Sequence, residues 1–328
     1  MKGVSVIICC YNSSNRITTT LEYLANQSVA SSISWEVIVV NNASTDNTRE
    51  VAQSHCIGSA VNPSFRIVDQ PIPGLTAARQ KGIEVSIYDI LIFCDDDNHF
   101  EPTYVQDAYE LMLRNSQIGI AGGWVKPRLP FYPGKWIEQN YAALAIGKQS
   151  DHNQFVEWVF GAGMILRKKF FDDLKSRKIK LLLSDRKGAN QSSGGDAELC
   201  QLAKFIGYKV YFSPNLILFH QIDGKRLTKQ SFIKSNFQNL HATVHLYLLE
   251  KLISDGNLTL RKIKLSLLRT RCSRILNAIP RLLSGRHSFL NFLEIGVGSV
   301  LISWILLHGS EIKKSFVEIK QNLDNGRF

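Results

Sequence analysis

The segment Ile90-Leu91-Ile92-Phe93-Cys94-Asp95-Asp96-Asp97 joins five apolar residues directly to three carboxylates. A short apolar run without polar alternation predicts a strand that is buried on both faces. Comparable runs lie at residues 4–9, 36–40 and 65–68. Amphipathic stretches separate the runs, at residues 16–27, 45–54 and 76–86. Buried strands that alternate with helices predict an α/β fold, with a doubly wound, mostly parallel sheet flanked by helices.

Polar residues follow each of the predicted strands. In open parallel sheets, ligands bind in the crevice beyond the carboxyl ends of the strands. Here those positions hold Tyr11, Asn41, Asn42 and the triplet Asp95-Asp96-Asp97. We therefore expect the functional site at this edge of the sheet.

The acidic triplet calls for an electrostatic explanation. Adjacent carboxylates repel one another unless protons or a cation neutralise them. Oxygen ligands favour Mg²⁺ or Mn²⁺, and such ions usually keep waters and bind substrate phosphates. The triplet therefore indicates a divalent ion shared with a nucleotide diphosphate. A solvated acidic turn ahead of a helix near Pro102 would carry the same residues, so the pattern alone leaves both readings open.

Five ordered segments resemble those of the family 2 inverting glycosyltransferases of GT-A fold. They are VSVIICCYN (residues 4–12), EVIVVNNASTDNT (36–48), GLTAARQKGIE (74–84), ILIFCDDDNHF (90–100) and GGDAELCQLAKFIGYKVYFSPNLILFH (194–220). The resemblance covers about residues 4–220. It implies transfer of a sugar from a nucleoside-diphosphate sugar, with a UDP-sugar favoured, onto an acceptor hydroxyl with inversion.

By this resemblance, Asp95 and Asp97 are the ends of a DxD signature that binds Mn²⁺ or Mg²⁺. Asp97 is expected to be the principal metal ligand, and Asp95 is expected to face the ribose or the metal. His220 ends an apolar run at a position where many relatives have a histidine near the metal or the diphosphate. A lone histidine after a strand is otherwise more often structural.

The nucleotide is expected to contact four further positions. Tyr11 matches the place where the family contacts the base, although a strand-end aromatic can equally pack in a core. Asn42 stands where many relatives have an aspartate that binds the base, and an amide can both donate and accept. Arg79 matches a segment beside the nucleotide, with a helix-surface arginine as the alternative. Asp96 is expected on the nucleotide side with Asp95.

The resemblance assigns the catalytic base to Asp196. Inversion requires a carboxylate that takes the proton of the acceptor hydroxyl as its oxygen attacks the anomeric carbon. Asp196 could instead serve only as the N-cap of a helix over residues 197–205. Glu198, two residues later, is the alternative base. Gly161 and Gly163 resemble the family's acceptor-side glycine segment.

The excess of basic over acidic residues lies entirely in the C-terminal third of the chain. The formal net charge is +11, yet residues 1–224 contain 22 basic and 22 acidic residues, and residues 225–328 contain 17 basic and 6 acidic residues. We therefore predict a catalytic domain over residues 1–224 and a helical, basic extension over residues 225–328. Six cysteines without CxxC spacing indicate reduced core thiols and a reducing compartment.

The extension suits an anionic membrane surface. Residues 256–293 contain no acid and interleave Arg and Lys with Leu and Ile. The apolar stretch 289–308 is interrupted by Asn291 and Glu294, so we expect an interfacial or re-entrant helix, with a single span as second choice. The expected acceptor is a glycan or a lipid-linked glycan, and the expected location is cytoplasmic, at the inner face of the cell membrane.

Two other classes of protein remain as alternatives. A sugar-phosphate nucleotidyltransferase would share the nucleotide and the metal, but it should carry a glycine-rich, lysine-containing loop that CCYNSSNR (residues 9–16) lacks. A basic protein that binds nucleic acid or membranes without catalysis is the other. We expect no nucleic-acid partner, because the basic residues lie outside the predicted sheet and no aromatic-plus-basic motif accompanies them.

Overall fold

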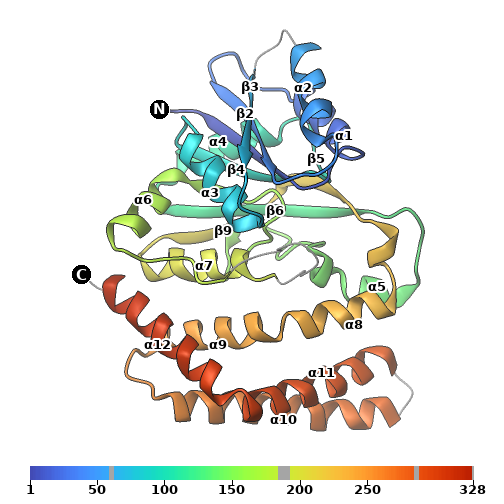
Figure 1. Ribbon diagram of the computed structural model, residues 1–328, viewed down its shortest axis with the longest axis vertical. Coiled ribbons are helices and arrows are strands. Elements are labelled where there is room, and N and C mark those ends of the chain that lie inside the picture. Colours follow the sequence, from blue (N-terminus) through green and yellow to red (C-terminus); the bar gives the residue numbers. More distant parts are fainter. Residues whose placement is uncertain (59–62, 184–192, 284–287, 327–328) are drawn as a thin grey trace.

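A computed structural model describes residues 1–58, 63–183, 193–283 and 288–326 of the chain. A central sheet carries helices on both faces, and the C-terminal helices stack beyond one of them (Figure 1). The strands are β1 (Val4–Cys10), β2 (Trp35–Asn42), β3 (Ser64–Gln70), β4 (Ile90–Asp95), β5 (Asn98–Phe100), β6 (Ile118–Arg128), β7 (Gln154–Phe155), β8 (Ile165–Arg167) and β9 (Lys209–Gln221).

The first helices cover the sheet, and the later ones form the extension. The former are α1 (Ile17–Ala25), α2 (Thr48–Gly58), α3 (Leu75–Val85), α4 (Tyr104–Arg114), α5 (Lys135–Glu138), α6 (Lys168–Ser176) and α7 (Gly195–Phe205), with a 3₁₀ turn η1 (Tyr141–Leu144). The latter are η2 (Gly224–Arg226), α8 (Lys229–Gln238), α9 (Leu240–Ser254), α10 (Leu260–Leu283), α11 (Ser288–Leu307) and α12 (Gly309–Gly326).

The strand order in the sheet is β3-β2-β1-β4-β8-β6-β9-β5, with β7 paired to β9. The four strands from β3 to β4 are parallel, as their continuous apolar character predicts. The second half of the sheet is mixed, because β8 runs antiparallel to both β4 and β6, and β5 runs antiparallel to β9. The predicted α/β class is confirmed. The apolar runs of the sequence did not indicate the antiparallel strands of the second half, in which β6 and β9 are parallel.

Alternate residues of the central strands pack on opposite faces of the sheet. Ile7 and Phe93 belong to a core shared with α3, α6, α7 and α9, whereas Ile8 and Ile92 belong to a second core shared with α1 and α4. Both faces are therefore buried, which is why these strands contain few polar residues. Helix α3 lies directly on β1 at Gly82, where any β-carbon would collide with the side chain of Ile7.

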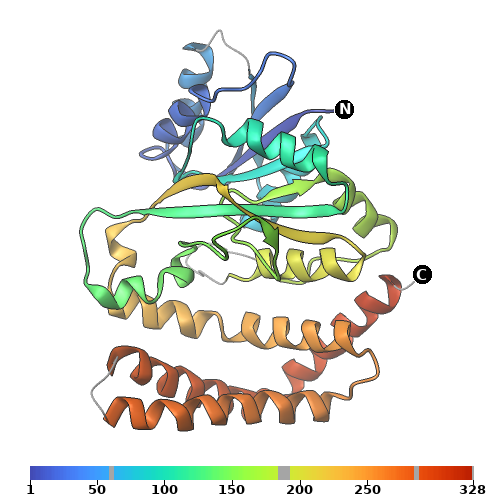
Figure 2. The same cartoon turned by 180° about the vertical axis from the view of Figure 1, so that it is seen from behind.

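The extension is helical, as predicted, and it forms two further layers. In Figures 1 and 2, α8 and α9 lie along one side of the sheet, and α10 and α11 form an antiparallel pair beyond them. Helix α12 returns to contact α9. Among the described residues, no single helix is long and apolar enough to cross a membrane. Only one bent pair of helical segments has the length and apolar composition of a membrane span. It consists of Phe292–Leu307 and Gly309–Gly326, which meet at an angle of 83°.

Candidate functional site

The carboxyl ends of β1, β2 and β4 meet at one edge of the sheet. In the strand register, Cys9 lies opposite Asp95, and Cys10 lies opposite Asn41. Tyr11 follows β1 directly, and 47% of its side chain is exposed. Its ring is thus available to a ligand rather than packed in the core, which was the alternative reading of this residue.

The middle aspartate of the triplet organises the loop after β1. Asp96 accepts a hydrogen bond from Ser13 Oγ and forms an ion pair with Arg16, whose Nη2 lies 2.7 Å from Asp96 Oδ2. Burial and the neighbouring Asp97 raise the pKa of Asp96, although Arg16 acts in the opposite direction. Asp96 therefore holds the β1–α1 loop in this structure. Sequence reasoning did not name Arg16, because its acidic partner lies 80 residues away in the chain.

Asp97 and His220 lie next to each other because of strand pairing. Asn98 of β5 lies opposite His220 of β9, and this places His220 Nε2 3.5 Å from Asp97 Oδ1. The backbone N–H of Gln221 donates to Asp97 O at 2.9 Å and fixes the turn. His220 is only 2% exposed, and its Nδ1 is buried without a hydrogen-bond partner in the described structure. A buried ring nitrogen without a partner is rare unless a ligand or ion completes the site.

These residues fit a divalent ion that takes part of its coordination from a substrate. Imidazole nitrogen and carboxylate oxygen are both donors that Mn²⁺ accepts, and Asp95 ends the neighbouring strand β4. Within residues 1–58, 63–183, 193–283 and 288–326, no three His, Cys, Asp or Glu side chains gather as a ligand cluster. Asp97 and His220 would therefore hold the ion together with phosphate oxygens and water, the arrangement that such ions favour at nucleotide sites.

Asn42 is buried and shapes the loop that follows β3. Its Nδ2 donates to the carbonyls of Gln70 and Ile72 at 3.0 and 2.6 Å, and its Oδ1 accepts from the N–H of Gly74 at 2.8 Å. The amide thus bonds three backbone groups of residues 70–74. Asn42 therefore fixes the position of this loop, which leads into α3 at Leu75.

Arg79 and Asp196 approach each other across Gly161. Arg79 is buried in α3, with its guanidinium carbon 4.7 Å from the centroid of the Phe93 ring. The N–H of Gly161 donates to Asp196 Oδ2 at 3.1 Å. A β-carbon at position 161 would lie 3.2 Å from Arg79 Nη2 and 3.4 Å from Asp196 Cβ, so only glycine leaves this space open. The structure therefore brings these three predicted site residues together.

The thiol of Cys9 shows that Arg79 and the acidic strand end share one region. Burial raises the pKa of Cys9 to about 12, and the charges of Arg79, Asp95 and Asp96 all act on it. Arg79 is thus near Cys9, which lies opposite Asp95, and near Gly161, whose N–H donates to Asp196. A cavity of about 1020 Å³ beside it is also lined by Gln80, Phe93 and Gly195.

Glu198 has a different role from Asp196. It is 1% exposed, and its two oxygens accept from the N–H groups of Leu182 and Leu183, each at 2.9 Å. The third partner of the Glu198 carboxylate is His245 of α9, whose Nε2 lies 3.2 Å from Glu198 Oε1. Asp196 instead lies in the first turn of α7, whose N-cap is Gly194 rather than Asp196, and its Oδ1 accepts from the N–H of Ala197 at 2.8 Å. Of the two carboxylates considered for the base, Glu198 is occupied by buried partners.

The sequence profile of glycosyl transferase family 2 matches residues 5–174, and the chain belongs to this family. It is 34% identical over 114 residues to the putative glycosyltransferase EpsH of Bacillus subtilis (strain 168), covering 35% of this chain and 30% of that protein. It is 25% identical over 229 residues to glycosyltransferase AglE of Haloferax volcanii, covering 69% of this chain and 70% of that one. The chain thus spans less than a third of EpsH.

Two solved structures share the fold. The crystal structure of S. aureus TarS 1–349 in complex with UDP-GlcNAc aligns with a TM-score of 0.53 and 15% identity over 99% of this chain and 81% of that one. The crystal structure of GalNAc-T7 with UDP, GalNAc and Mn²⁺ aligns with a TM-score of 0.54 and 14% identity over 75% and 47%. At these identities the likeness shows the fold, and the expected GT-A fold and family are confirmed.

Proposed function

We propose that this protein transfers a sugar from a nucleoside-diphosphate sugar onto an acceptor hydroxyl with inversion. The observation that carries the proposal is the pairing of Asn98 with His220, which sets the buried His220 Nε2 3.5 Å from Asp97 Oδ1 at the ligand-binding edge of the sheet. A UDP-sugar is the favoured donor, because the solved relatives TarS and GalNAc-T7 contain UDP-GlcNAc and UDP.

The donor site uses the residues at the ends of β1 and β4. The exposed ring of Tyr11 offers an apolar face to the base, while Asp95 lies toward the ribose. A bound Mn²⁺ or Mg²⁺ would neutralise the charge that develops on the leaving diphosphate. Asp97 and His220 would hold that ion, and the buried Arg79 of α3 would attract the same phosphates.

The acceptor side uses Asp196 as general base. The acceptor oxygen forms the new bond to the anomeric carbon, the bond from that carbon to the diphosphate breaks, and the hydroxyl proton passes to the Asp196 carboxylate. Hydrogen bonds from the N–H groups of Gly161 and Ala197 hold this carboxylate in one orientation. Attack from the face opposite the leaving group gives inversion, and the glycine at 161 leaves room for the sugar.

A glycan or lipid-linked glycan is the proposed acceptor, and the proposed location is the cytoplasmic face of the cell membrane. The α10–α11 pair presents exposed Leu276 and Phe292, and α10 also carries exposed basic residues such as Arg261 and Lys262. Apolar side chains beside Lys and Arg suit an anionic bilayer, where each cation contributes about 1 kcal/mol. Leu276→Asp and Phe292→Asp should weaken flotation with phosphatidylglycerol vesicles, whereas Leu113→Asp on α4 should not.

The decisive experiment incubates the protein with UDP-, GDP- and dTDP-sugars and Mn²⁺ and identifies the products. Glycosyl transfer, or slow transfer to water, releases nucleoside diphosphate and a sugar of inverted anomeric configuration. A nucleotidyltransferase would instead require added pyrophosphate and would convert the nucleotide sugar into a nucleoside triphosphate and a sugar 1-phosphate. Formation of these two products in a parallel reaction with pyrophosphate, or a transfer product of retained configuration, would refute the proposal.

A further inference from the structure

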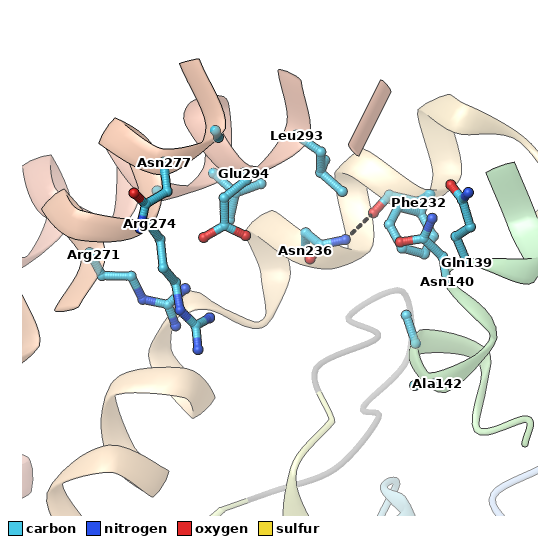
Figure 3. Close-up of a pocket in the computed structure, with 14 residues that line it drawn as sticks. Gln139, Asn140, Ala142, Phe232, Asn236, Arg271, Arg274, Asn277, Leu293 and Glu294 are labelled. Carbon is cyan, nitrogen blue, oxygen red and sulfur yellow. Dashed lines mark hydrogen bonds between the residues drawn. The ribbon is translucent and has the colours of Figure 1, made fainter. Parts of the chain in front are cut away.

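A second cavity, of about 870 Å³, lies between the extension and the segment that follows β6 (Figure 3). We call it the interhelical cavity. Its walls come from residues before and within η1, from α8 and from the α10–α11 pair. Its polar and charged lining residues are Gln139, Asn140, Asn236, Arg271, Arg274, Asn277 and Glu294.

Two cations of α10 line this cavity without ion-pair partners. Figure 3 shows Arg271 and Arg274, which are three residues apart, extending in the same direction with their guanidinium groups side by side. Neither forms an ion pair or hydrogen bond with any residue that the structure describes, and Arg271 Nε is buried. Burial and the neighbouring Arg274 lower the pKa of Arg271, while Glu294 acts in the opposite direction. Arg271 is half-buried and Arg274 is exposed, and two adjacent cations favour an anion between them.

The rest of the lining is suited to hydroxyl groups. Glu294 of α11 faces the arginines in Figure 3, and its Oε1 is buried without a hydrogen-bond partner in the described structure. Asn236 Nδ2 donates to Phe232 O at 2.9 Å, and Asn140 Nδ2 donates to Trp136 O at 2.6 Å, so each side-chain oxygen remains as an acceptor. An anion alone would be repelled by Glu294, whereas a hydroxyl can donate to it.

The cavity adjoins the strands that carry the candidate active site. Pro127 of β6 lies opposite His220 of β9, and the chain then continues from β6 through α5 to η1. Ile222, two residues after His220, packs in one small core with Ile137 and Leu144 of this segment. A ligand in the cavity would therefore touch a segment that is packed against the end of β9.

We propose that the interhelical cavity binds a hydroxyl-bearing phosphate ester, with the phosphate between Arg271 and Arg274 and a hydroxyl donating to Glu294. The planar guanidinium groups suit phosphate oxygens, which accept two parallel N–H bonds from each. The site is separate from the one that binds the donor. A soluble sugar phosphate or polyol phosphate and the headgroup of phosphatidylglycerol both present this chemistry.

The test is calorimetric binding of glycerol 3-phosphate and of inorganic phosphate to the full chain. Arg271→Gln and Arg274→Gln should each weaken glycerol 3-phosphate binding by about tenfold or more. Arg269→Gln, which removes the same charge from an exposed position on the same helix, should leave it unchanged. Glu294→Gln should tighten inorganic phosphate binding and reduce the preference for glycerol 3-phosphate. Thermal unfolding of each variant shows that it is folded.

Binding to phosphatidylglycerol vesicles then shows whether the phosphate belongs to a lipid headgroup or to a soluble ester. If Arg271→Gln weakens binding to phosphatidylglycerol vesicles more than Arg269→Gln does, the headgroup enters the cavity. If the two variants bind vesicles equally while glycerol 3-phosphate binding still separates them, the ligand is a soluble ester. The proposal is overturned if the parent chain does not bind glycerol 3-phosphate, or if Arg269→Gln weakens binding as much as Arg271→Gln.

Discussion

His245 Nε2 of α9 lies 3.2 Å from Oε1 of Glu198 on α7, and both side chains are almost fully buried. This contact joins the extension to the helix whose first turn carries Asp196. A buried carboxylate depends on all its partners, because loss of one leaves charge without water to solvate it.

Replacement of His245 by Leu should lower the free energy of unfolding by about 1–3 kcal/mol, because Glu198 then loses a buried hydrogen-bond partner. Urea denaturation measures the difference. His241→Leu is the matched control, since this histidine is exposed one turn earlier on the same helix. Equal destabilisation by the two substitutions would show that the contact of His245 with Glu198 does not contribute to the free energy of unfolding beyond what the exposed His241 contributes.

Asp97→Asn should weaken Mn²⁺-dependent binding of the donor by at least about tenfold, because an amide is a poorer ligand for a hard cation than a carboxylate. Titration of the nucleotide sugar with and without Mn²⁺ separates metal-dependent from metal-independent affinity. Asp255→Asn makes the same charge change in the exposed turn after α9 and should bind as the parent does. Unchanged affinity in Asp97→Asn would remove this residue from the metal site.

Asp196→Asn should bind the donor normally and yet transfer sugar at least about a hundredfold more slowly, because the amide cannot take the acceptor proton. The amide oxygen can keep the hydrogen bond from Gly161, while the bond from Ala197 is lost because the amide nitrogen cannot accept it. Donor affinity and kcat are measured on one preparation, with Asp255→Asn again as the control. Transfer at the parent rate would assign the base elsewhere.

Stability should fall in mild acid because of His99. Burial, and secondarily the charge of Arg128, lower the pKa of His99 to about 4, and its Nδ1 lies 3.0 Å from Arg128 Nη1. The unfolded chain takes up this proton near pH 6.5 and the folded chain only near pH 4, so the contribution is present above pH 6.5 and is lost as pH falls between these values. The loss is about 2–3 kcal/mol.

Urea unfolding of the parent and of His99→Gln at pH 7, 5.5 and 4.5 checks this dependence. The variant should lose less stability over the range than the parent does. His152→Gln, at an exposed loop position, should follow the parent. A parent and a His99→Gln variant with parallel pH curves would contradict the prediction.

The parallel half of the fold could be predicted from sequence because its signal is local. Residues 90–94 are apolar without interruption, and they form the strand Ile90–Asp95 with both faces covered. The order of strands in the second half depends on contacts between distant segments. Strand β8 has three residues and inserts between β4 and β6, a placement that no pattern in Ile165–Arg167 indicates.

The residues of the candidate site could be predicted where they lie in segments that resemble the family. Contacts between side chains that are distant in the sequence could not be predicted. Arg79, Gly161 and Asp196 were named separately, and the structure places them together. The ion pair of Arg16 with Asp96 was missed, because charge complementarity across 80 residues leaves no spacing signal. The roles of the named residues in binding and catalysis stay predictions, as does the domain boundary after residue 224.

The burial of α9 against the sheet has a consequence for chimaeras. Leu240, Val244 and Leu248 belong to the same core as Ile7 of β1, and His245 completes the set of partners around Glu198. Ile263 of α10, Leu301 of α11 and Ile319 of α12 belong to this core as well, so a hybrid enzyme that exchanges C-terminal segments between relatives should keep α9 to α12 together with its own sheet. A junction at residue 224 would graft foreign side chains into the core behind the candidate base.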